Sequence, residues 1–350
     1  MVNNLSEVKN VKELEVYIED ENITDLHIEQ KKDKGILRIR VNGELEEVKE
    51  FSKEEVLSLV AKIKVRSKLE LDKKRICQDG SFNTTLKGKE YSIRVSSLPT
   101  IFGEKINLRV LRNKTAYSLE SLKFIPKDTL DLLLCANSGL FLIGGPTGSG
   151  KTTTLCNIIN SIDTVGKNII TIEDPVEYII PNANQVEVNE KANFNFSNIL
   201  KSVLRQDPDI IVIGELRDEE TARLALRAAL TGHLVISTIH CNDSYGAINR
   251  LLDMGIDKTL IKDTLIAVIY QRLLKRKCNC ENKSKCLICG GKGYKGKVVA
   301  GEYIVNDRYD IENDLSKDYL CKNKIPLRKY CKGLWEKKII PKEEYLSLLI

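Results

Sequence analysis

The sequence predicts an α/β protein in which a parallel β-sheet follows a smaller α+β domain. From Leu119 onward, short apolar runs alternate with helical stretches, which is the pattern of a parallel sheet covered by helices on both faces. The first 112 residues instead contain short strands joined by tight turns. A glycine-rich turn joins the first apolar run of the second part to a helix. In such open sheets, ligands gather at the carboxyl ends of the strands.

Length and composition bound the class of protein. The chain has 350 residues, of which 42% are hydrophobic, enough for two domains with ordinary cores. No window approaches the roughly 18–20 apolar residues of a membrane-spanning helix, and residues 1–20 are acidic and polar, unlike a signal peptide. Of the ten cysteines only four cluster, which favours a reducing compartment over a disulfide framework. We therefore expect a cytoplasmic protein.

The N-terminal domain is predicted to span residues 1–112. A helix is expected over Val11–Glu19, and Ser52 with Glu55 forms a capping box before another helix. Asn42-Gly43 and Lys87-Gly88-Lys89 are typical of hairpin turns. The expected strands are Asp25–Glu29, Ile36–Val41, Glu44–Val48, Phe82–Leu86, Tyr91–Ser96 and Lys105–Leu111.

The second part is predicted to follow a short polar linker, residues 113–118. A core domain spans 119–275, a cysteine-rich insert 276–300 and a helical C-terminal region 301–350. The expected core strands are Leu140–Ile143, Asn168–Ile172, Asp209–Ile213 and Leu234–Ile239.

The glycine-rich turn fits the phosphate-loop template GxxxxGK[ST]. It reads Gly145, Pro146, Thr147, Gly148, Ser149, Gly150, Lys151 and Thr152, after an apolar strand and before the helical stretch Thr153–Ile162. Backbone N–H groups of such a loop surround phosphate, and the helix N-terminus adds its positive dipole end. Lys151 is expected to reach the β- and γ-phosphates and Thr152 to bind Mg²⁺, with Thr153 completing the ATP site.

Hydrolysis further requires one carboxylate that orients or deprotonates water and another near the metal ion. Glu173-Asp174, with Glu177, follows one predicted strand, and Glu215 follows the next, Ile210–Ile213. Charged residues after a strand often form only a solvated loop. Here both groups follow successive strands of one sheet, so we expect them to face the phosphate loop.

Three further segments of the core are distinctive: Asn168–Tyr178 (NIITIEDPVEY), Leu204–Asp218 (LRQDPDIIVIGELRD) and Thr231–His240 (TGHLVISTIH), which is followed by Asn242-Asp243. In this order they resemble the aspartate box, the Walker B segment and the histidine box of one family, the motor ATPases of type II secretion and type IV pilus assembly. Further sequence segments that resemble the family lie upstream, at Asp25–Glu29, Gln78–Gly80 and Arg94–Lys105. The resemblance covers roughly residues 24–305 and implies a RecA-like ATPase core behind a PAS-like domain.

The resemblance implies a cyclic homo-hexamer with nucleotide bound between the two domains. Glu173 would activate water, and Glu215 would be the Walker B glutamate near Mg²⁺. His233 and His240 would sense the γ-phosphate, although a histidine beside a strand is often structural, as we expect for His27.

The resemblance also implies that Arg94 and Arg109 act as arginine fingers. An arginine on an alternating strand is more commonly only a surface cation. If both contact phosphate, nucleotide favours a closed arrangement of the domains, and hydrolysis lets the smaller domain swing.

The four clustered cysteines indicate a structural zinc site. Cys278, Cys280, Cys286 and Cys289 lie within twelve residues, and four thiolates suit tetrahedral Zn²⁺. The first pair has one intervening residue rather than two, so an unmetallated reduced loop is the alternative. Such an insert is similar to that of the assembly and secretion branch, whereas retraction ATPases lack it.

Nine lysines and arginines lie between Gln271 and Ala300, against the single Glu281. This stretch could face anionic lipid, an acidic membrane partner or only solvent. Nucleic acid is not expected, because this stretch lacks the repeated aromatic residues that would be interleaved with the basic ones.

The preferred function is a hexameric ATPase that docks on an inner-membrane platform protein, peripheral to the membrane, and powers assembly of type IV pili, competence pseudopili or a secretion pseudopilus. The alternatives are a retraction ATPase and a nucleotide-gated, non-catalytic scaffold or regulator. The chain begins close to the N-terminal domain that matches the family. In this it resembles the short relatives found in Gram-positive competence and pilus systems.

Overall fold

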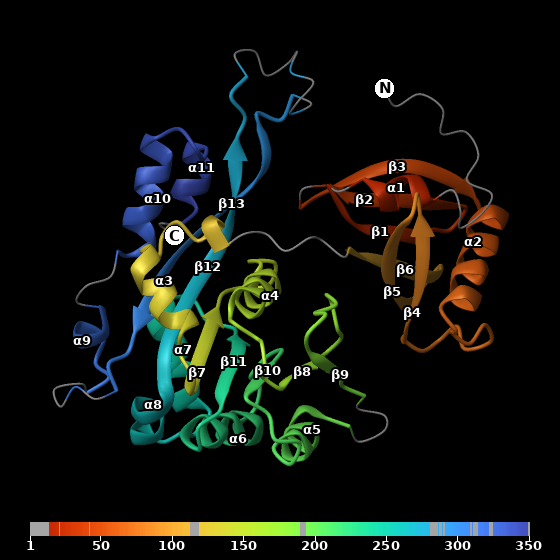
Figure 1. Ribbon diagram of the computed structural model, residues 1–350. Helices are drawn as coiled ribbons and strands as arrows, with labels where there is room; N and C mark the ends of the chain where they lie inside the picture. Colours follow the sequence, from red (N-terminus) through yellow and green to blue (C-terminus); the bar gives the residue numbers. More distant parts are fainter. Residues whose placement is uncertain are drawn as a thin grey trace. The chain divides into compact units, whose positions relative to one another are not determined.

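The computed structural model divides into two compact units, Met1–Asn113 and Lys114–Ile350 (Figure 1). Each is described by itself. The described residues are 14–20, 22–41, 43–112, 119–189, 194–280, 286, 289, 291–308, 310, 314–321 and 325–348. The predicted linker, residues 113–118, and the first part of the predicted N-terminal helix lie outside these ranges.

The first unit is a six-stranded antiparallel sheet in the order β3-β2-β1-β6-β5-β4. Alternation along β5 places Ile93 and Val95 in the core and Arg94 on the opposite, polar face. Helix α2 covers the apolar face with Val56 and Ile63. The elements are α1 Glu15–Glu19, β1 Ile23–Gln30, β2 Lys34–Val41, β3 Glu44–Ser52, α2 Lys53–Arg66, β4 Gln78–Leu86, β5 Lys89–Thr100 and β6 Gly103–Arg112.

Two local signals in this unit act as predicted, and Asn42 of the predicted Asn42-Gly43 turn lies outside the described residues. Ser52 Oγ accepts from the Glu55 N–H at 3.2 Å, and the Glu55 carboxylate accepts from the Ser52 N–H at 2.8 Å, which completes the capping box. The β4–β5 hairpin turns through Lys87 and Gly88, whose φ angles are +49° and +76°. Such paired positive angles match the right-handed twist of the flanking strands.

The second unit contains a seven-stranded sheet in the order β13-β12-β7-β11-β10-β8-β9. Its strands are β7 Gly139–Gly144, β8 Ile169–Glu173, β9 Asn184–Glu187, β10 Ile210–Ile213, β11 Leu234–Ile239, β12 Leu265–Lys277 and β13 Tyr294–Val305. Neighbouring strands are parallel except β12 and β13. The four predicted core strands are confirmed, whereas β9, β12 and β13 were not predicted.

Helices cover both faces of this sheet, as its fully buried and largely apolar central strands require (Figure 1). One core lies between the sheet and α3 and α4, and the other between the sheet and α5 to α8. The helices are α3 Lys127–Leu134, α4 Lys151–Ser161, α5 Phe196–Val203, α6 Glu219–Leu230, α7 Ser244–Asp253, α8 Lys258–Thr264, α9 Lys317–Cys321, α10 Leu327–Glu336 and α11 Lys342–Leu346. This is the RecA-like α/β arrangement that the sequence predicts.

Strands β12 and β13 form a long hairpin that extends past the rest of the sheet (Figure 1). Helices α10 and α11 pack beside it through a small core that includes Leu274, Cys331 and Ile340. Residues 301–305 still belong to β13. The C-terminal region predicted as helical from residue 301 therefore begins with strand, because β13 keeps its pairing with β12 there.

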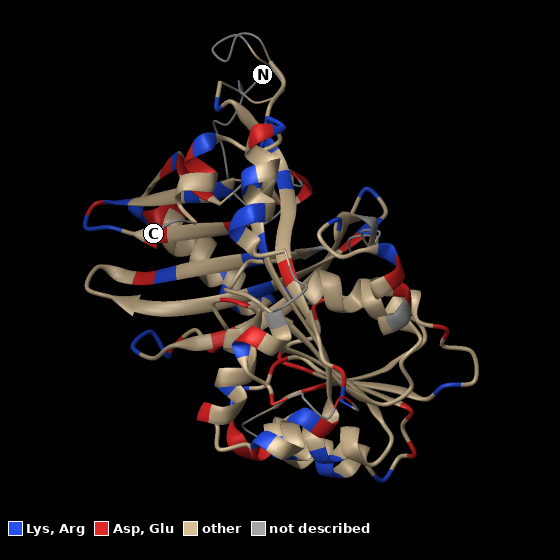
Figure 2. Cartoon of the chain, turned by 90° about the vertical axis from the view of Figure 1, so that its left-hand side faces the viewer, with Lys and Arg blue, Asp and Glu red and all other residues tan. Residues whose placement is uncertain are grey.

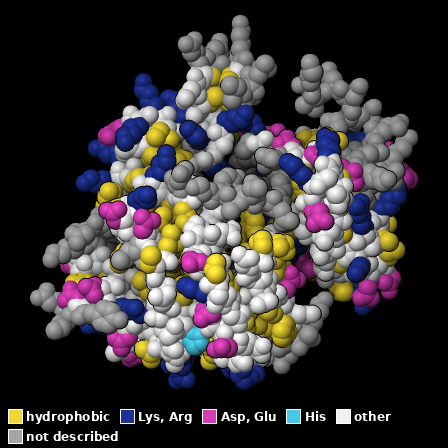
Figure 3. Space-filling model, in the orientation of Figure 1, with side chains coloured by type: hydrophobic (Ala, Val, Ile, Leu, Met, Phe, Trp, Pro, Cys, Tyr) yellow, Lys and Arg dark blue, Asp and Glu magenta, His cyan; other side chains and the backbone are white. Residues whose placement is uncertain are grey.

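The surface carries both signs of charge. Basic and acidic residues are interspersed along the helices (Figure 2), and apolar side chains lie in small groups between charged ones on the face shown in Figure 3. On the hairpin, Arg276, Lys277, Lys295 and Lys297 are exposed. Within the described ranges, no helix has the length and apolar character needed to cross a membrane.

Candidate functional site

The phosphate loop joins β7 to α4 at the carboxyl edge of the sheet. Gly145, Gly148 and Gly150 adopt φ angles of +150°, +76° and +85°, conformations that favour glycine. Lys151 Nζ donates to the carbonyl oxygens of Gly145 and Pro146 at 2.9 and 3.2 Å. Its ammonium group therefore lies against the loop at the N-terminus of α4, where an anion is favoured.

The electrostatics of Lys151 connect the loop to the acidic groups. Burial lowers the pKa of Lys151, and the negative charges of Glu215 and Glu177 partly offset this effect. An anionic phosphate at the same place would further favour the charged ammonium form.

Two carboxylates reach this edge from neighbouring strands. Strands β8 and β10 pair in register from Ile169 opposite Ile210 to Ile172 opposite Ile213. Glu173 is the last residue of β8, and Glu215 lies two residues beyond β10. The sheet register therefore brings the two predicted acidic groups to the same edge.

Glu173 lies in a buried, hydrogen-bonded setting. It is 4% exposed, and its Oε1 accepts from Thr171 Oγ1 at 2.7 Å and from Gln185 Nε2 at 2.9 Å. Burial raises the pKa of Glu173, while the two hydrogen bonds oppose the rise. A raised pKa is suited to a carboxylate that accepts a proton during a reaction.

Glu215 belongs to a network of charged groups. Its two carboxylate oxygens lie 3.0 Å from Arg217 Nε and 3.2 Å from His240 Nε2. Arg217 also lies 3.4 Å from a carboxylate oxygen of Asp174. His240 thus meets the Glu215 carboxylate at the edge where the phosphate loop lies.

His233 does not join this group. It precedes β11, whereas His240 follows it, and a strand of six residues places them about 23 Å apart. His233 Nδ1 lies 2.9 Å from the Ala228 carbonyl oxygen and 3.2 Å from Thr231 Oγ1. Within one chain the two histidines therefore lie at opposite ends of one strand, and only His240 lies at the edge that carries the phosphate loop.

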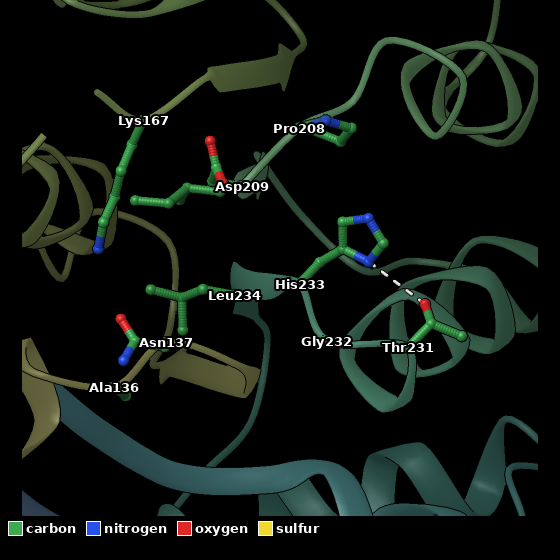
Figure 4. A pocket seen from close by; sticks show the side chains of 10 residues that line it. Ala136, Asn137, Lys167, Pro208, Asp209, Thr231, Gly232, His233 and Leu234 are labelled. Atoms are coloured by element: carbon green, nitrogen blue, oxygen red, sulfur yellow. Dashed lines mark hydrogen bonds between the residues drawn. The ribbon is translucent and has the colours of Figure 1, made fainter. Parts of the chain in front are cut away.

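A cavity of about 320 Å³ lies beside His233 at the amino edge of the sheet (Figure 4). Lys167, Asp209 and Asn137 line it, each from a segment close to the start of a strand. Asp209 accepts from the Asn168 N–H at 2.6 Å. Asp209 of the cavity thus also stabilises the segment that leads into β8.

Arg94 and Arg109 lie on the polar face of the first unit. They are directly opposite one another on β5 and β6, and both are exposed. Arg109 Nε donates to Asp25 Oδ1 at 3.0 Å. Burial would raise the pKa of Asp25, but hydrogen bonds from Arg109 and Thr24 outweigh burial and lower it. Arg94 lies beside the Arg109–Asp25 ion pair, so this face carries both signs of charge.

The four cysteines of the hairpin meet at one point. Their sulfur atoms lie within 4.8 Å of one another, with 3.9 Å between Cys278 and Cys286 and 3.7 Å between Cys280 and Cys289. Four sulfurs bonded to Zn²⁺ at about 2.3 Å in a tetrahedron lie about 3.8 Å apart. The Gly293 N–H also donates to Cys289 Sγ at 3.3 Å. The residues therefore fit a structural zinc ion despite the irregular first pair.

Sequence reasoning missed three residues at the site. Gln185 of β9 holds Glu173, Arg217 bridges Glu215 to Asp174, and Gln271 of β12 contacts the phosphate loop. Arg217 lies inside the segment Leu204–Asp218, which resembles a Walker B motif. The two glutamines have no local signal, because each reaches its partner through sheet pairing.

The fold and the site define a P-loop nucleotide-binding protein with a RecA-like core and a tetracysteine hairpin. Residues 8–318 match the family described as "Type II/IV secretion system protein", and the chain belongs to this family. The resemblance seen in the motifs is thereby confirmed.

Curated relatives support this placement. The chain is 42% identical over 261 residues to the "Putative type II secretion system protein E" of Escherichia coli (strain K12), covering 74% of the chain and 53% of the relative. It is 38% identical over 323 residues to the "Type IV pilus assembly ATPase PilB" of Thermus thermophilus, covering 84% of the chain and 36% of the relative. The chain thus spans about half or less of these two proteins.

Solved structures show the same fold. The pilus retraction motor PilT with bound ADP matches with a TM-score of 0.70 and 26% identity, covering 97% of this chain and 96% of that one. The Legionella pneumophila ATPase DotB matches with a TM-score of 0.77 at 22% identity, covering 97% and 94%.

Proposed function

We propose that this chain hydrolyses ATP and uses the energy to drive assembly of a pilus, a competence pseudopilus or a type II secretion pseudopilus. The observation that carries the proposal is the meeting of Lys151, Glu173 and Glu215 at one edge of the sheet. A phosphate loop with its lysine and two carboxylates are the groups that an ATPase needs. The names of the relatives point in the same direction.

The residues divide the work at the proposed site. Loop amides and Lys151 bind the phosphates, the Thr152 hydroxyl and Glu215 hold Mg²⁺, and Glu173 accepts a proton from the attacking water. A bound Mg²⁺ neutralises phosphate charge. His240, beside Glu215, is placed to respond to the γ-phosphate.

Motion is proposed to come from the first unit. Arg94 and Arg109 form a cationic pair of which Arg109 already binds Asp25, and nucleotide would add a further anionic partner. Loss of the γ-phosphate removes that contact and releases the unit. We propose that a homo-hexamer carries out this cycle.

The tetracysteine hairpin is proposed to bind structural Zn²⁺ and to mark the assembly and secretion branch. In this proposal the protein acts in the cytoplasm, peripheral to the membrane, on an inner-membrane platform protein. The likeness to PilT favours a second candidate, a retraction motor. The cysteine insert and the relatives named for secretion and assembly favour the first.

The test is steady-state ATP turnover by the purified chain, with its mass in solution measured by light scattering. We expect turnover by a hexamer, and Glu215→Gln to bind ATP but lose at least about a hundredfold in rate. A wild-type chain that binds ATP without turnover would instead indicate a scaffold or regulator. To separate assembly from retraction, the gene is deleted: absent filaments support assembly, and excess filaments support retraction.

A further inference from the structure

Gln271 lies behind the phosphate loop with both ends of its side-chain amide engaged. The residue is fully buried. Its Nε2 donates to the Ser149 carbonyl oxygen at 2.8 Å, and its Oε1 accepts from Thr154 Oγ1 at 2.8 Å. Only one orientation of the amide satisfies both partners, since a carbonyl oxygen can only accept.

The two contacts hold the loop at separate points. Ser149 directly precedes Gly150, the N-cap of α4, and Thr154 lies one turn inside that helix. Gln271 therefore connects the end of the loop and the first turn of α4 to strand β12.

Strand β12 also limits the loop by contact. A Cβ atom at Gly145 would lie 2.5 Å from the Gln271 carbonyl oxygen, and one at Gly150 would lie 3.3 Å from Gln271 Nε2. Parallel pairing of β12 with β7 ends at Tyr270 opposite Gly144. Gln271 thus stands level with the point where the chain leaves β7 and enters the loop.

The bond to Ser149 sets the direction of one amide group. In a trans peptide the C=O and the following N–H point in opposite directions. Because the Ser149 carbonyl points at Gln271, the Gly150 N–H points away from β12. Loop N–H groups turned in this way are the donors that surround phosphate.

We propose that Gln271 is a positioning residue for nucleotide binding: it orients the Ser149–Gly150 peptide and the start of α4 so that the phosphate loop is preformed. This inference rests on the proposal that the loop binds nucleotide, and it identifies a residue outside the loop on which binding depends. It also makes β12, the strand that leads to the tetracysteine hairpin, part of the wall of the nucleotide site.

Substitution by glutamate gives a reversible test. In Gln271→Glu the side chain can still accept from Thr154, but an ionised carboxylate faces the Ser149 carbonyl without a donor. Once protonated, it can donate again, and burial raises the pKa of such a group. Binding should therefore be impaired at high pH and recover as the pH falls.

The readout is the dissociation constant of Mg-ADP, measured by calorimetric titration of the full chain at pH 6.0 and pH 8.5 and divided by the wild-type value at each pH. We expect Gln271→Glu to weaken binding about tenfold or more at pH 8.5, and clearly less at pH 6.0. Gln271→Met, which keeps the volume but neither bond, should weaken binding equally at both.

A matched control is offered by Gln30, a buried glutamine of the first unit that accepts from the Glu104 N–H at 2.9 Å. Gln30→Glu should leave Mg-ADP affinity unchanged. Wild-type affinity in both Gln271 variants, a pH-independent loss in Gln271→Glu, or an equal loss in Gln30→Glu would each overturn the inference while the proposed function stands. A wild-type chain without affinity for Mg-ADP would overturn both.

Discussion

The hydrogen bonds around Glu173 lead to a quantitative prediction about the pH dependence of ATP turnover. Glu173 must be ionised to accept a proton from water, and burial raises its pKa above the ordinary value of 4.5. Activity should therefore fall as the pH drops through this raised pKa. The fall in kcat/KM on the acid side reports the pKa of the free enzyme's base.

Thr171 and Gln185 donate to the same oxygen of Glu173 and oppose the effect of burial. A hydrogen bond to a charged group contributes about 1.5–3 kcal/mol. Removing one donor should therefore destabilise the ionised form of Glu173 and raise its pKa further. Thr171→Val removes the donor at nearly unchanged volume, whereas Thr171→Ser keeps the hydroxyl.

The assay is ATP turnover from pH 5.5 to 9 for the wild type and the two Thr171 variants. We expect the acid side of the Thr171→Val profile to move to higher pH, with the plateau at high pH retained. Thr171→Ser should follow the wild type. A profile of Thr171→Val that coincides with the wild type would refute the assignment of Glu173 as the base, and so would full turnover by Glu173→Gln.

Three further predictions follow from separate parts of the chain. Purified protein should contain about one zinc ion per chain by elemental analysis, and Cys280→Ser should lower both zinc content and melting temperature; metal-free protein of unchanged stability would contradict the zinc site. His240→Ala should slow ATP turnover and His233→Ala should leave Mg-ADP affinity unchanged, because only His240 lies at the carboxyl edge of the sheet. Equal effects of the two substitutions on both measurements would contradict this placement of the histidines. Lys64 is 1% exposed and donates to Glu104 at 2.8 Å, so Lys64→Met should cost about 3–5 kcal/mol in urea unfolding; a loss below about 1 kcal/mol would show that Glu104 finds another partner.

Local signals carried much of the fold. The capping box at Ser52 and the turn at Lys87-Gly88 form as predicted, because each depends on residues a few positions apart. The core strands were recognisable since strands buried on both faces are continuous apolar runs. Strand β12 ends in Leu-Leu-Lys-Arg-Lys and β13 begins with Tyr-Lys-Gly-Lys, so neither has a continuous apolar or cleanly alternating pattern along its length.

Within the candidate site, the sequence by itself determined the chemical groups: a phosphate loop, two carboxylates after successive strands and four clustered thiols. The resemblance of three sequence motifs indicated the family, and the match of residues 8–318 to the family model confirms this assignment. These features are local in the chain, so their spacing alone could reveal them.

Only the tertiary structure decided which groups meet. It placed His240 against Glu215 and His233 at the far end of the same strand, although the two histidines are seven residues apart. It also brought Gln271 to Ser149 across 122 residues. The physical reason is that sheet order and register, which depend on packing of the whole domain, determine which strand ends lie side by side.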